Sequence, residues 1–196
     1  TGAVTPPGAP IDTLPLAEMA AAYAKKPLTD QPGTKWSYNN NAINLLGRII
    51  EVASGKPFAD FMEERLFEPL GMTNTTFWPS PDHLDVLAKP YSKSKDSGEL
   101  VEAKNSRFSE PLHDQKRTAM ASGGLYSCAK DLGKLYQMLL NEGQLDGKRY
   151  LKAATLKQMT SNQLGDMSKV NFAPGMQMGL GFHIVHAPQD ATESLS

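Results

Sequence analysis

The sequence lacks several features that mark particular classes of protein. It holds a single cysteine, Cys128, among 196 residues, which excludes an internal disulfide and any cysteine-rich zinc site. It has no excess of positive charge, because 20 lysine and arginine residues are balanced by 21 aspartate and glutamate residues. Nucleic-acid-binding proteins usually carry a basic excess, so this balance argues against that class. The longest apolar runs span only a few residues, which is too short for a membrane-spanning helix.

The remaining composition is that of a folded domain. Hydrophobic residues make up 40% of the chain and charged residues 21%, proportions that suit a globular core. We expect residues 1–196 to form a single domain or part of one. Residues 1–8 have no starting methionine and no helical or strand period, and residues 187–196 are loop-like. We therefore expect the sequence to be a piece of a longer protein.

Five stretches show the spacing of apolar residues that is typical of helices. They are about residues 14–25, about residues 41–53, a stretch that starts at residue 57, a stretch that starts after residue 127 and about residues 152–160. Thr13 is a candidate N-cap of the first helix, and Asn40 or Asn41 can cap the second, which Gly55 closes. The apolar stripe of the second helix consists of Ile43, Leu46, Ile49 and Ile50. In the fourth helix we expect Leu132, Leu135, Met138 and Leu139 to point inward.

Strand signals are fewer than helix signals. The turn formed by residues 96–98 predicts a short hairpin within residues 89–104, and residues 180–185 have the pattern of one strand. The irregular stretch at residues 74–120 suggests a surface that covers a cleft or a partner. The predicted fold is therefore mainly α with minor β.

Residues 32–40, Pro-Gly-Thr-Lys-Trp-Ser-Tyr-Asn-Asn, are the first candidates for chemistry. The Pro-Gly pair predicts a turn, a short extended piece follows, and a helix begins after it. A tyrosine placed just before a helix N-terminus, as Tyr38 is, could have its phenolate stabilised by the helix dipole and by nearby cations. Such a tyrosine can move protons. The alternative is that Tyr38 packs its ring, bonds its hydroxyl and does nothing else.

Several motifs together resemble the serine β-lactamase-like superfamily, in the branch of class C β-lactamases, related esterases and D-alanyl-D-alanine peptidases. Each motif is weak alone, but they occur in the family's order and extend from about residue 14 to residue 185. The matching stretches are residues 32–40, 45–51 (Leu-Leu-Gly-Arg-Ile-Ile-Glu), 68–72 (Glu-Pro-Leu-Gly-Met), 121–127 (Ala-Ser-Gly-Gly-Leu-Tyr-Ser) with 131–132, 138–141 (Met-Leu-Leu-Asn) and 179–182 (Gly-Leu-Gly-Phe).

The resemblance implies a fold, a mechanism and two site residues. The chain would be the helical lobe of a β-lactamase/transpeptidase-like fold, with residues 180–185 as a strand of the partner lobe. A serine in a Ser-x-x-Lys motif would attack an ester, a β-lactam or a D-amino-acid peptide and form an acyl-enzyme. Tyr38 would be the catalytic tyrosine of the Tyr-x-Asn motif, and Asn40 would contact the substrate. The family implies no metal or organic cofactor and a periplasmic, secreted or membrane-attached bacterial protein.

The sequence also departs from the family pattern. No Ser-x-x-Lys motif precedes Tyr38, and the family's final Lys- or His-x-Gly motif is absent. Ser-x-x-Lys does occur at residues 127–130 and 92–95. We interpret the first as a helix-capping serine and the second as part of a polar hairpin, because an activated nucleophile needs a positioned base in a desolvated pocket.

Three hypotheses follow from these departures. The chain is a piece of a working serine hydrolase and is inactive alone, or it is a non-catalytic binding or structural domain. In the third hypothesis it is one half of an assembly in which another chain supplies the serine-bearing lobe.

The remaining candidate residues have ordinary interpretations. In a strand, His183 and His186 would face opposite sides and could not share a metal ion. His83 and His113 are expected to be solvated in loops, and Cys128 to be a small packing residue.

Overall fold

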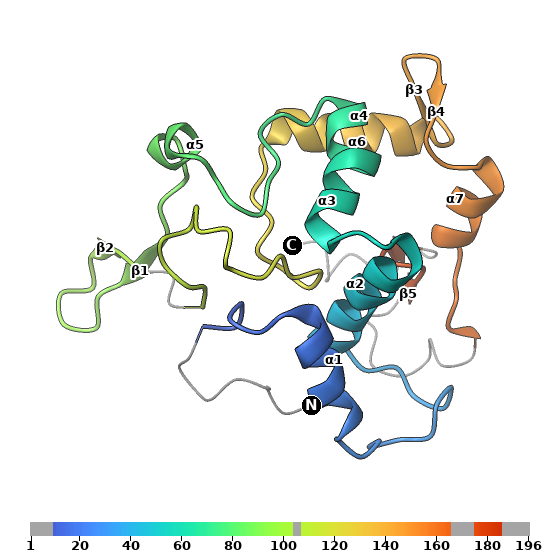
Figure 1. Ribbon diagram of the computed structural model, residues 1–196, viewed down its shortest axis with the longest axis horizontal. Coiled ribbons are helices and arrows are strands. Elements are labelled where there is room, and N and C mark those ends of the chain that lie inside the picture. The colour runs from blue at the N-terminus through green and yellow to red at the C-terminus, as the bar shows by residue number, and fades with distance from the viewer. Residues whose placement is uncertain (1–9, 104–106, 166–174, 186–196) are drawn as a thin grey trace. The chain divides into compact units, whose positions relative to one another are not determined.

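The computed structural model describes residues 10–103, 107–165 and 175–185. The chain forms two compact units. Unit 1 consists of residues 1–26 and 39–132, and unit 2 consists of residues 27–38 and 133–196. Each unit is described by itself below, and Figure 1 shows the elements along the chain.

Unit 1 contains most of the helices and one hairpin. Its elements are α1 (Leu16–Ala24), α2 (Asn40–Ser54), α3 (Phe58–Met62), a π-helical turn (Glu63–Phe67), α4 (Glu68–Leu70), α5 (Pro81–Asp85), β1 (Tyr91–Lys93), β2 (Leu100–Glu102) and the start of α6 (Ala129–Leu140). Strands β1 and β2 pair antiparallel, with Ser92 opposite Val101. The hairpin predicted within residues 89–104 is thus confirmed.

Helices α1 and α2 pack closely because α2 carries a glycine where they meet. A Cβ atom on Gly47 would lie 3.0 Å from the Cβ of Ala121 and 3.1 Å from a methyl group of Leu16. Leu16 and Met19 of α1 are buried on this side. A larger residue at position 47 would therefore push α1 or the segment at Ala121 away from α2.

The caps of these helices differ from the sequence expectations. Helix α1 begins at Leu16 after Pro15, and the Thr13 hydroxyl donates to the Pro10 carbonyl oxygen at 3.5 Å. Thr13 is therefore not the N-cap, because the chain bends before it can reach the first turn of the helix. Gly55 ends α2 in the left-handed conformation, at φ +71°, as predicted.

The core of unit 1 is built on clustered aromatic rings. Phe77 lies 5.6 Å from Phe58 and 6.4 Å from Phe67, measured between ring centroids, and 6.2 Å from Trp78. Phe58, Phe67 and Phe77 are each buried. These tilted contacts join α3 and the π-helical turn to the segment that follows α4.

A buried ion pair ties three segments of unit 1 together. Arg117 donates from Nε to Oδ2 of Asp12 at 2.7 Å, and both side chains are at most 4% exposed. The other oxygen of Asp12 accepts from the backbone and the hydroxyl of Ser109, each at 2.9 Å. Arg117 also donates to the carbonyl oxygens of Phe77 and Leu112. The charges are therefore paired and hydrogen-bonded, as burial requires.

A second buried carboxylate anchors the start of α6. Oδ2 of Asp131 accepts from the backbone of Asn74 at 2.7 Å and from the hydroxyl of Thr75 at 2.9 Å. The Thr75 hydroxyl also lies 2.8 Å from the Ser127 hydroxyl. Asp131 is completely buried, so it fixes the turn at residues 74–75 against the first turn of α6. Leu132, expected to point inward, is instead 37% exposed, because Asp131 occupies the buried side.

Among its described residues, unit 2 contains the later part of α6, one short helix, two hairpins and the irregular segment at residues 27–38. Strands β3 (Gln144–Leu145) and β4 (Lys148–Arg149) pair around a turn, α7 spans Ala153–Met159, and β5 (Met176–Met178) pairs antiparallel with β6 (His183–Val185). Met138 of α6 and Leu156 of α7 are buried, as the sequence predicts for Met138. The strand predicted at residues 180–185 is shorter than expected, because residues 179–182 form the turn that leads into β6.

None of the helices in residues 10–103, 107–165 and 175–185 is long and apolar enough to cross a membrane.

We expect the Arg117–Asp12 pair to control the stability of unit 1. Arg117→Met leaves the Asp12 carboxylate buried without its partner, which should lower the free energy of unfolding by about 3–5 kcal/mol. Lys89→Met is the matched control, since its ion pair with Glu102 is exposed on both sides and should be worth less than about 1 kcal/mol. Chemical denaturation measures both, and equal losses would contradict the assigned role.

We expect unit 2 to tolerate no side chain at Gly179. A Cβ atom there would lie 2.1 Å from the carbonyl oxygen of Met159, so Gly179→Ala should destabilise the protein by about 1–3 kcal/mol. Gly133→Ala in α6 is the control, because a Cβ at Gly133 meets nothing within 4 Å and alanine favours the helix by up to about 1 kcal/mol. The midpoint temperature of thermal unfolding should fall for Gly179→Ala and rise for Gly133→Ala.

Candidate functional site

The segment that carries Tyr38 begins with the predicted turn. Gly33 adopts the left-handed conformation at φ +80°. Thr34 donates from its backbone nitrogen and its hydroxyl to the Gln31 carbonyl oxygen, at 3.1 and 2.7 Å. Lys35 pairs with Asp30 at 3.7 Å. The Pro-Gly turn is confirmed, and it fixes the start of the irregular segment that ends at Tyr38.

Tyr38 itself presents its side chain to the surface. Tyr38 is 70% exposed, so its ring is not buried by packing against the described residues. Tyr126 differs, because its side chain is partly buried and burial raises the pKa of its phenol, against the lowering effect of nearby Arg117. A raised pKa disfavours the phenolate form of Tyr126. Tyr38 is therefore the better placed of these two tyrosines for chemistry with a solute.

The cap of α2 is Asn39, where the sequence analysis expected Asn40 or Asn41. Asn39 has an extended backbone, and its Oδ1 accepts from the backbone nitrogens of Asn41 at 2.9 Å and Ala42 at 3.3 Å. The expectation was wrong by one residue because the chain enters the helix at Asn40 and not after it. Capping therefore does not use the side chain of Asn40, which lies exposed in the first turn.

Asn44 connects α2 to a second segment of unit 1. It is buried, and its Oδ1 accepts from the backbone nitrogen of Ser122 at 3.0 Å. Because residues four apart lie on the same side of a helix, Asn44 lies one turn below Asn40. The segment at residues 121–124 is thus held beside the N-terminal half of α2. This contact was not predicted from the sequence, although an asparagine inside an apolar helix is a signal for a buried polar bond.

Neither downstream Ser-x-x-Lys sequence has the surroundings of a nucleophile. Ser127 bonds the hydroxyl of Thr75, and Lys130 is exposed. The carbonyl oxygen of Cys128 accepts the first bonds of α6, which places Cys128 at the helix boundary where we had expected Ser127. Ser92 lies exposed in β1. The hydroxyl of Ser127 thus lies against Thr75.

The remaining sequence candidates are scattered. His83 lies in α5 rather than in a loop, with its Nδ1 atom 3.2 Å from the Ser80 hydroxyl. His183 is exposed in β6, Cys128 is half-buried, and His113 is exposed. His186 lies outside the described residues. No three His, Cys, Asp or Glu side chains gather as a metal site in the part of the chain that the structure describes.

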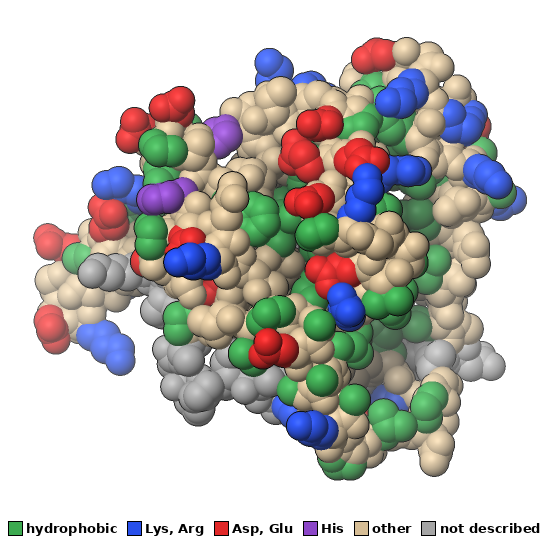
Figure 2. All heavy atoms as spheres, in the orientation of Figure 1, with side chains coloured by type: hydrophobic (Ala, Val, Ile, Leu, Met, Phe, Trp, Pro, Cys, Tyr) green, Lys and Arg blue, Asp and Glu red, His purple; other side chains and the backbone are tan. Residues whose placement is uncertain are grey.

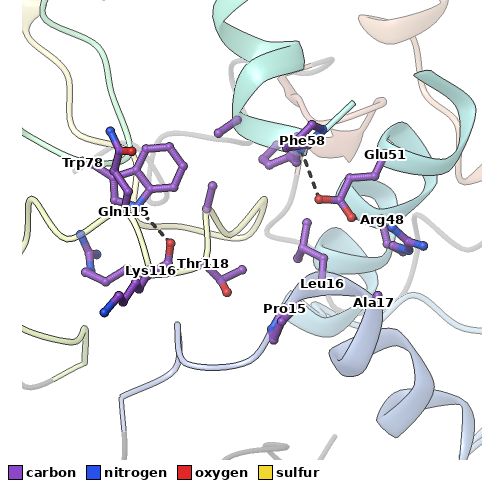
Figure 3. A pocket seen from close by; sticks show the side chains of 14 residues that line it. Pro15, Leu16, Ala17, Arg48, Glu51, Phe58, Trp78, Gln115, Lys116 and Thr118 are labelled. Atoms are coloured by element: carbon purple, nitrogen blue, oxygen red, sulfur yellow. Dashed lines mark hydrogen bonds and ion pairs between the residues drawn. The ribbon is translucent and has the colours of Figure 1, made fainter. Parts of the chain in front are cut away.

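Unit 1 also contains a pocket of about 330 Å³ that the sequence analysis did not predict. Its wall combines aromatic and apolar side chains with Arg48 and Glu51, which pair at 2.9 Å (Figure 3). The other carboxylate oxygen of Glu51 accepts from the backbone nitrogen of Phe58. Trp78 donates from its indole to the Arg117 carbonyl oxygen at 3.0 Å. Arg48, Glu51 and the Trp78 indole therefore each have a polar partner already. Neither Tyr38 nor Asn40 lines this pocket.

The charges visible on the surface are mixed in sign. Figure 2 shows acidic and basic side chains close to one another on the face drawn, in keeping with 20 basic and 21 acidic residues in the sequence. This face offers no broad basic surface of the kind that tracks a phosphate backbone.

Known proteins resemble this chain along most of its length. Rv1367c of Mycobacterium tuberculosis strain H37Rv is 31% identical over 174 residues, which cover 86% of this chain and 42% of that protein. The lovastatin esterase of Penicillium rubens is 31% identical over 157 residues, which cover 79% of this chain and 37% of the esterase. The chain therefore spans less than half the length of these two relatives.

A solved structure shows the fold. EstCE1, a hydrolase with promiscuous acyltransferase activity, matches with a TM-score of 0.71 and 22% identity, over 94% of this chain and 50% of EstCE1. This likeness confirms a β-lactamase/transpeptidase-like fold. The family model described as Beta-lactamase matches residues 2–193. The resemblance stated from the motifs is confirmed, and the chain belongs to the Beta-lactamase family.

Proposed function

We propose that this chain is part of a serine hydrolase that forms an acyl-enzyme on an ester, a β-lactam or a D-amino-acid peptide. The observation that carries the proposal is the Tyr-x-Asn motif at residues 38–40, at the start of α2, in a chain of the Beta-lactamase family. The nucleophilic serine and its lysine are proposed to come from polypeptide outside this sequence, so this chain alone is inactive.

In the proposed reaction Tyr38 carries a proton. The serine oxygen bonds to the substrate carbonyl carbon while its proton passes to the lysine and tyrosine pair, and the leaving group departs with a proton from that pair. Water then attacks the acyl-enzyme, releases the acid and returns the proton to the serine. The exposed position of Tyr38 supports this role, because most of the residue is open to solvent.

Asn40 is proposed to contact the substrate. The cap bonds made by Asn39 support this assignment, since they leave the Asn40 amide unused by the helix N-terminus. Asn39 stands where serine or alanine is commoner in the motif, and its side chain provides the oxygen that an N-cap needs. The ester class is the first to test, because one relative is named an esterase and EstCE1 is described as a hydrolase with promiscuous acyltransferase activity.

We also propose how this chain fits the family fold. Residues 14–185 would form most of the helical lobe of one β-lactamase-like domain, and β6 would belong to the sheet of the partner lobe. Most of the secondary structure of unit 1 is helical, which supports its assignment to the helical lobe.

Tyr38→Phe tests the catalytic role in the serine-containing enzyme. The variant should lower the acylation rate with a reactive ester by roughly 10²–10⁴-fold, because it removes a positioned proton carrier. Tyr136→Phe is the control, since Tyr136 is also exposed, at 57%, and lies outside the motif. Stopped-flow release of a chromogenic alcohol measures both rates, and an unchanged rate for Tyr38→Phe would refute the proposal.

Substitution of Asn39 should affect mainly stability, and substitution of Asn40 should affect mainly activity. Asn39→Ala removes the cap of α2 and should cost about 1 kcal/mol of unfolding free energy. Asn40→Ala should change the stability by less than about 0.5 kcal/mol and should lower kcat/KM by about tenfold or more, the loss expected for one hydrogen bond to substrate. Denaturation and steady-state assays on both variants measure the difference, and a reversed pattern would exchange the two roles.

A further inference from the structure

The pocket of unit 1 has the size of a small-molecule site. Its volume of about 330 Å³ lies at the lower end of the range of about 300–1,000 Å³ that is typical of ligand pockets. Leu16, Phe58 and Ala119 line it, and each of them is buried. The wall therefore includes side chains of the core of unit 1, and the pocket is a recess in that core.

Hydrogen bonds hold the two aromatic side chains of the pocket in place. Figure 3 shows Trp78 on one side of the pocket and Phe58 with Glu51 on the other. The Trp78 indole donates to the Arg117 carbonyl oxygen at 3.0 Å. The backbone nitrogen of Phe58 donates to Oε1 of Glu51 at 3.2 Å. A pocket with walls fixed in this way loses little freedom when a ligand enters, which favours binding.

The charged groups of the wall favour a neutral ligand. Glu51 is the only acidic residue among those that line the pocket, and the basic ones are Arg48, Lys116 and Arg117. Arg48 is paired with Glu51. Arg117 is paired with Asp12, and Lys116 is exposed. A ligand cation would meet three basic residues. A ligand anion would meet the Glu51 carboxylate without finding an unpaired buried cation.

The Glu51 carboxylate can accept a further hydrogen bond. Its Oε1 accepts from the backbone of Phe58, and its Oε2 accepts from Nη1 of Arg48 at 2.9 Å. An ionised carboxylate has about four acceptor positions, so each oxygen retains one. The side chain of Glu51 is 20% exposed and forms part of the pocket wall. It is therefore available to a donor group on a molecule in the pocket.

We infer that this pocket is a second binding site, for a neutral aromatic molecule of one or two rings that carries an N–H or O–H donor. The ring lies between Trp78 and Phe58, where aromatic contacts are favourable, and the donor bonds Glu51. The site is separate from the one proposed at Asn40. Arg48 follows Asn40 by eight residues in α2, which is about 12 Å along the helix axis at about 1.5 Å per residue.

The test uses the full-length product of the gene that encodes this sequence, with indole as the probe. Indole should bind with a Kd of roughly 1 mM or below, measured by isothermal titration calorimetry. 1-Methylindole lacks the N–H donor and should bind about tenfold more weakly or worse, because a hydrogen bond to a charged group is lost. 3-Methylindole has the same size and keeps the N–H, so it should bind as tightly as indole.

A matched pair of variants locates the bound probe. Ala17 lines the pocket, so Ala17→Phe puts a ring into the space of the ligand and should weaken indole binding by about tenfold or more. Ala21→Phe is the control, because Ala21 is also exposed in α1 but does not line the pocket. It should leave the Kd unchanged. The unfolding temperatures of both variants are measured to show that they fold.

Four results would overturn the proposal. Absence of indole binding would mean that the pocket takes no such ligand in the whole protein. Equal affinity for indole and 1-methylindole would remove the role of Glu51. An unchanged Kd in Ala17→Phe would mean that indole binds elsewhere. A loss of indole binding in Asn40→Ala would place the indole in the site proposed for the substrate. The readout is equilibrium binding, so a failure here is distinct from an unchanged acylation rate in Tyr38→Phe.

Discussion

The buried ion pair between Arg117 and Asp12 is the constraint on which the arrangement of unit 1 depends. Asp12 lies in the segment before α1, and Arg117 lies in a long stretch with little regular structure. Through its guanidinium, Arg117 also bonds the carbonyl oxygen of Phe77, within the aromatic cluster. The pair must be complete because a lone buried charge is costly.

This constraint orders the surroundings of α2. The backbone of Thr118 donates to Asp12 at 2.8 Å, and the chain then runs through the buried residues Ala119 and Met120 to Ser122, which bonds Asn44. Helix α2 is therefore held by its polar and small residues. Its N-terminus is closed by Asn39, and Asn40 stays open beside it. A site built in this way has rigid support for the side chain that we propose to contact the substrate.

Much of the secondary structure could be predicted from the sequence. The periodic stretches that contain α2, α6 and α7 became helices, and the turn at residues 96–98 became a hairpin. The β3–β4 hairpin was missed, although Asp146-Gly147 is a strong turn signal, because its strands are two residues long. The N-cap of α2 was misplaced by one residue, since several asparagines in a row offer the same chemistry.

The sequence by itself determined the family, the Tyr38 and Asn40 motif, and the amphipathic character of α2, because these depend on residue order and local spacing. Only the tertiary structure decided which face of α2 is buried and which carboxylates are paired. Asp12 and Arg117 are separated by about a hundred residues, and no local pattern links them. Which face of a helix is buried depends on the groups that pack against it. In unit 1, Ala121 and Ser122 pack against Gly47 and Asn44.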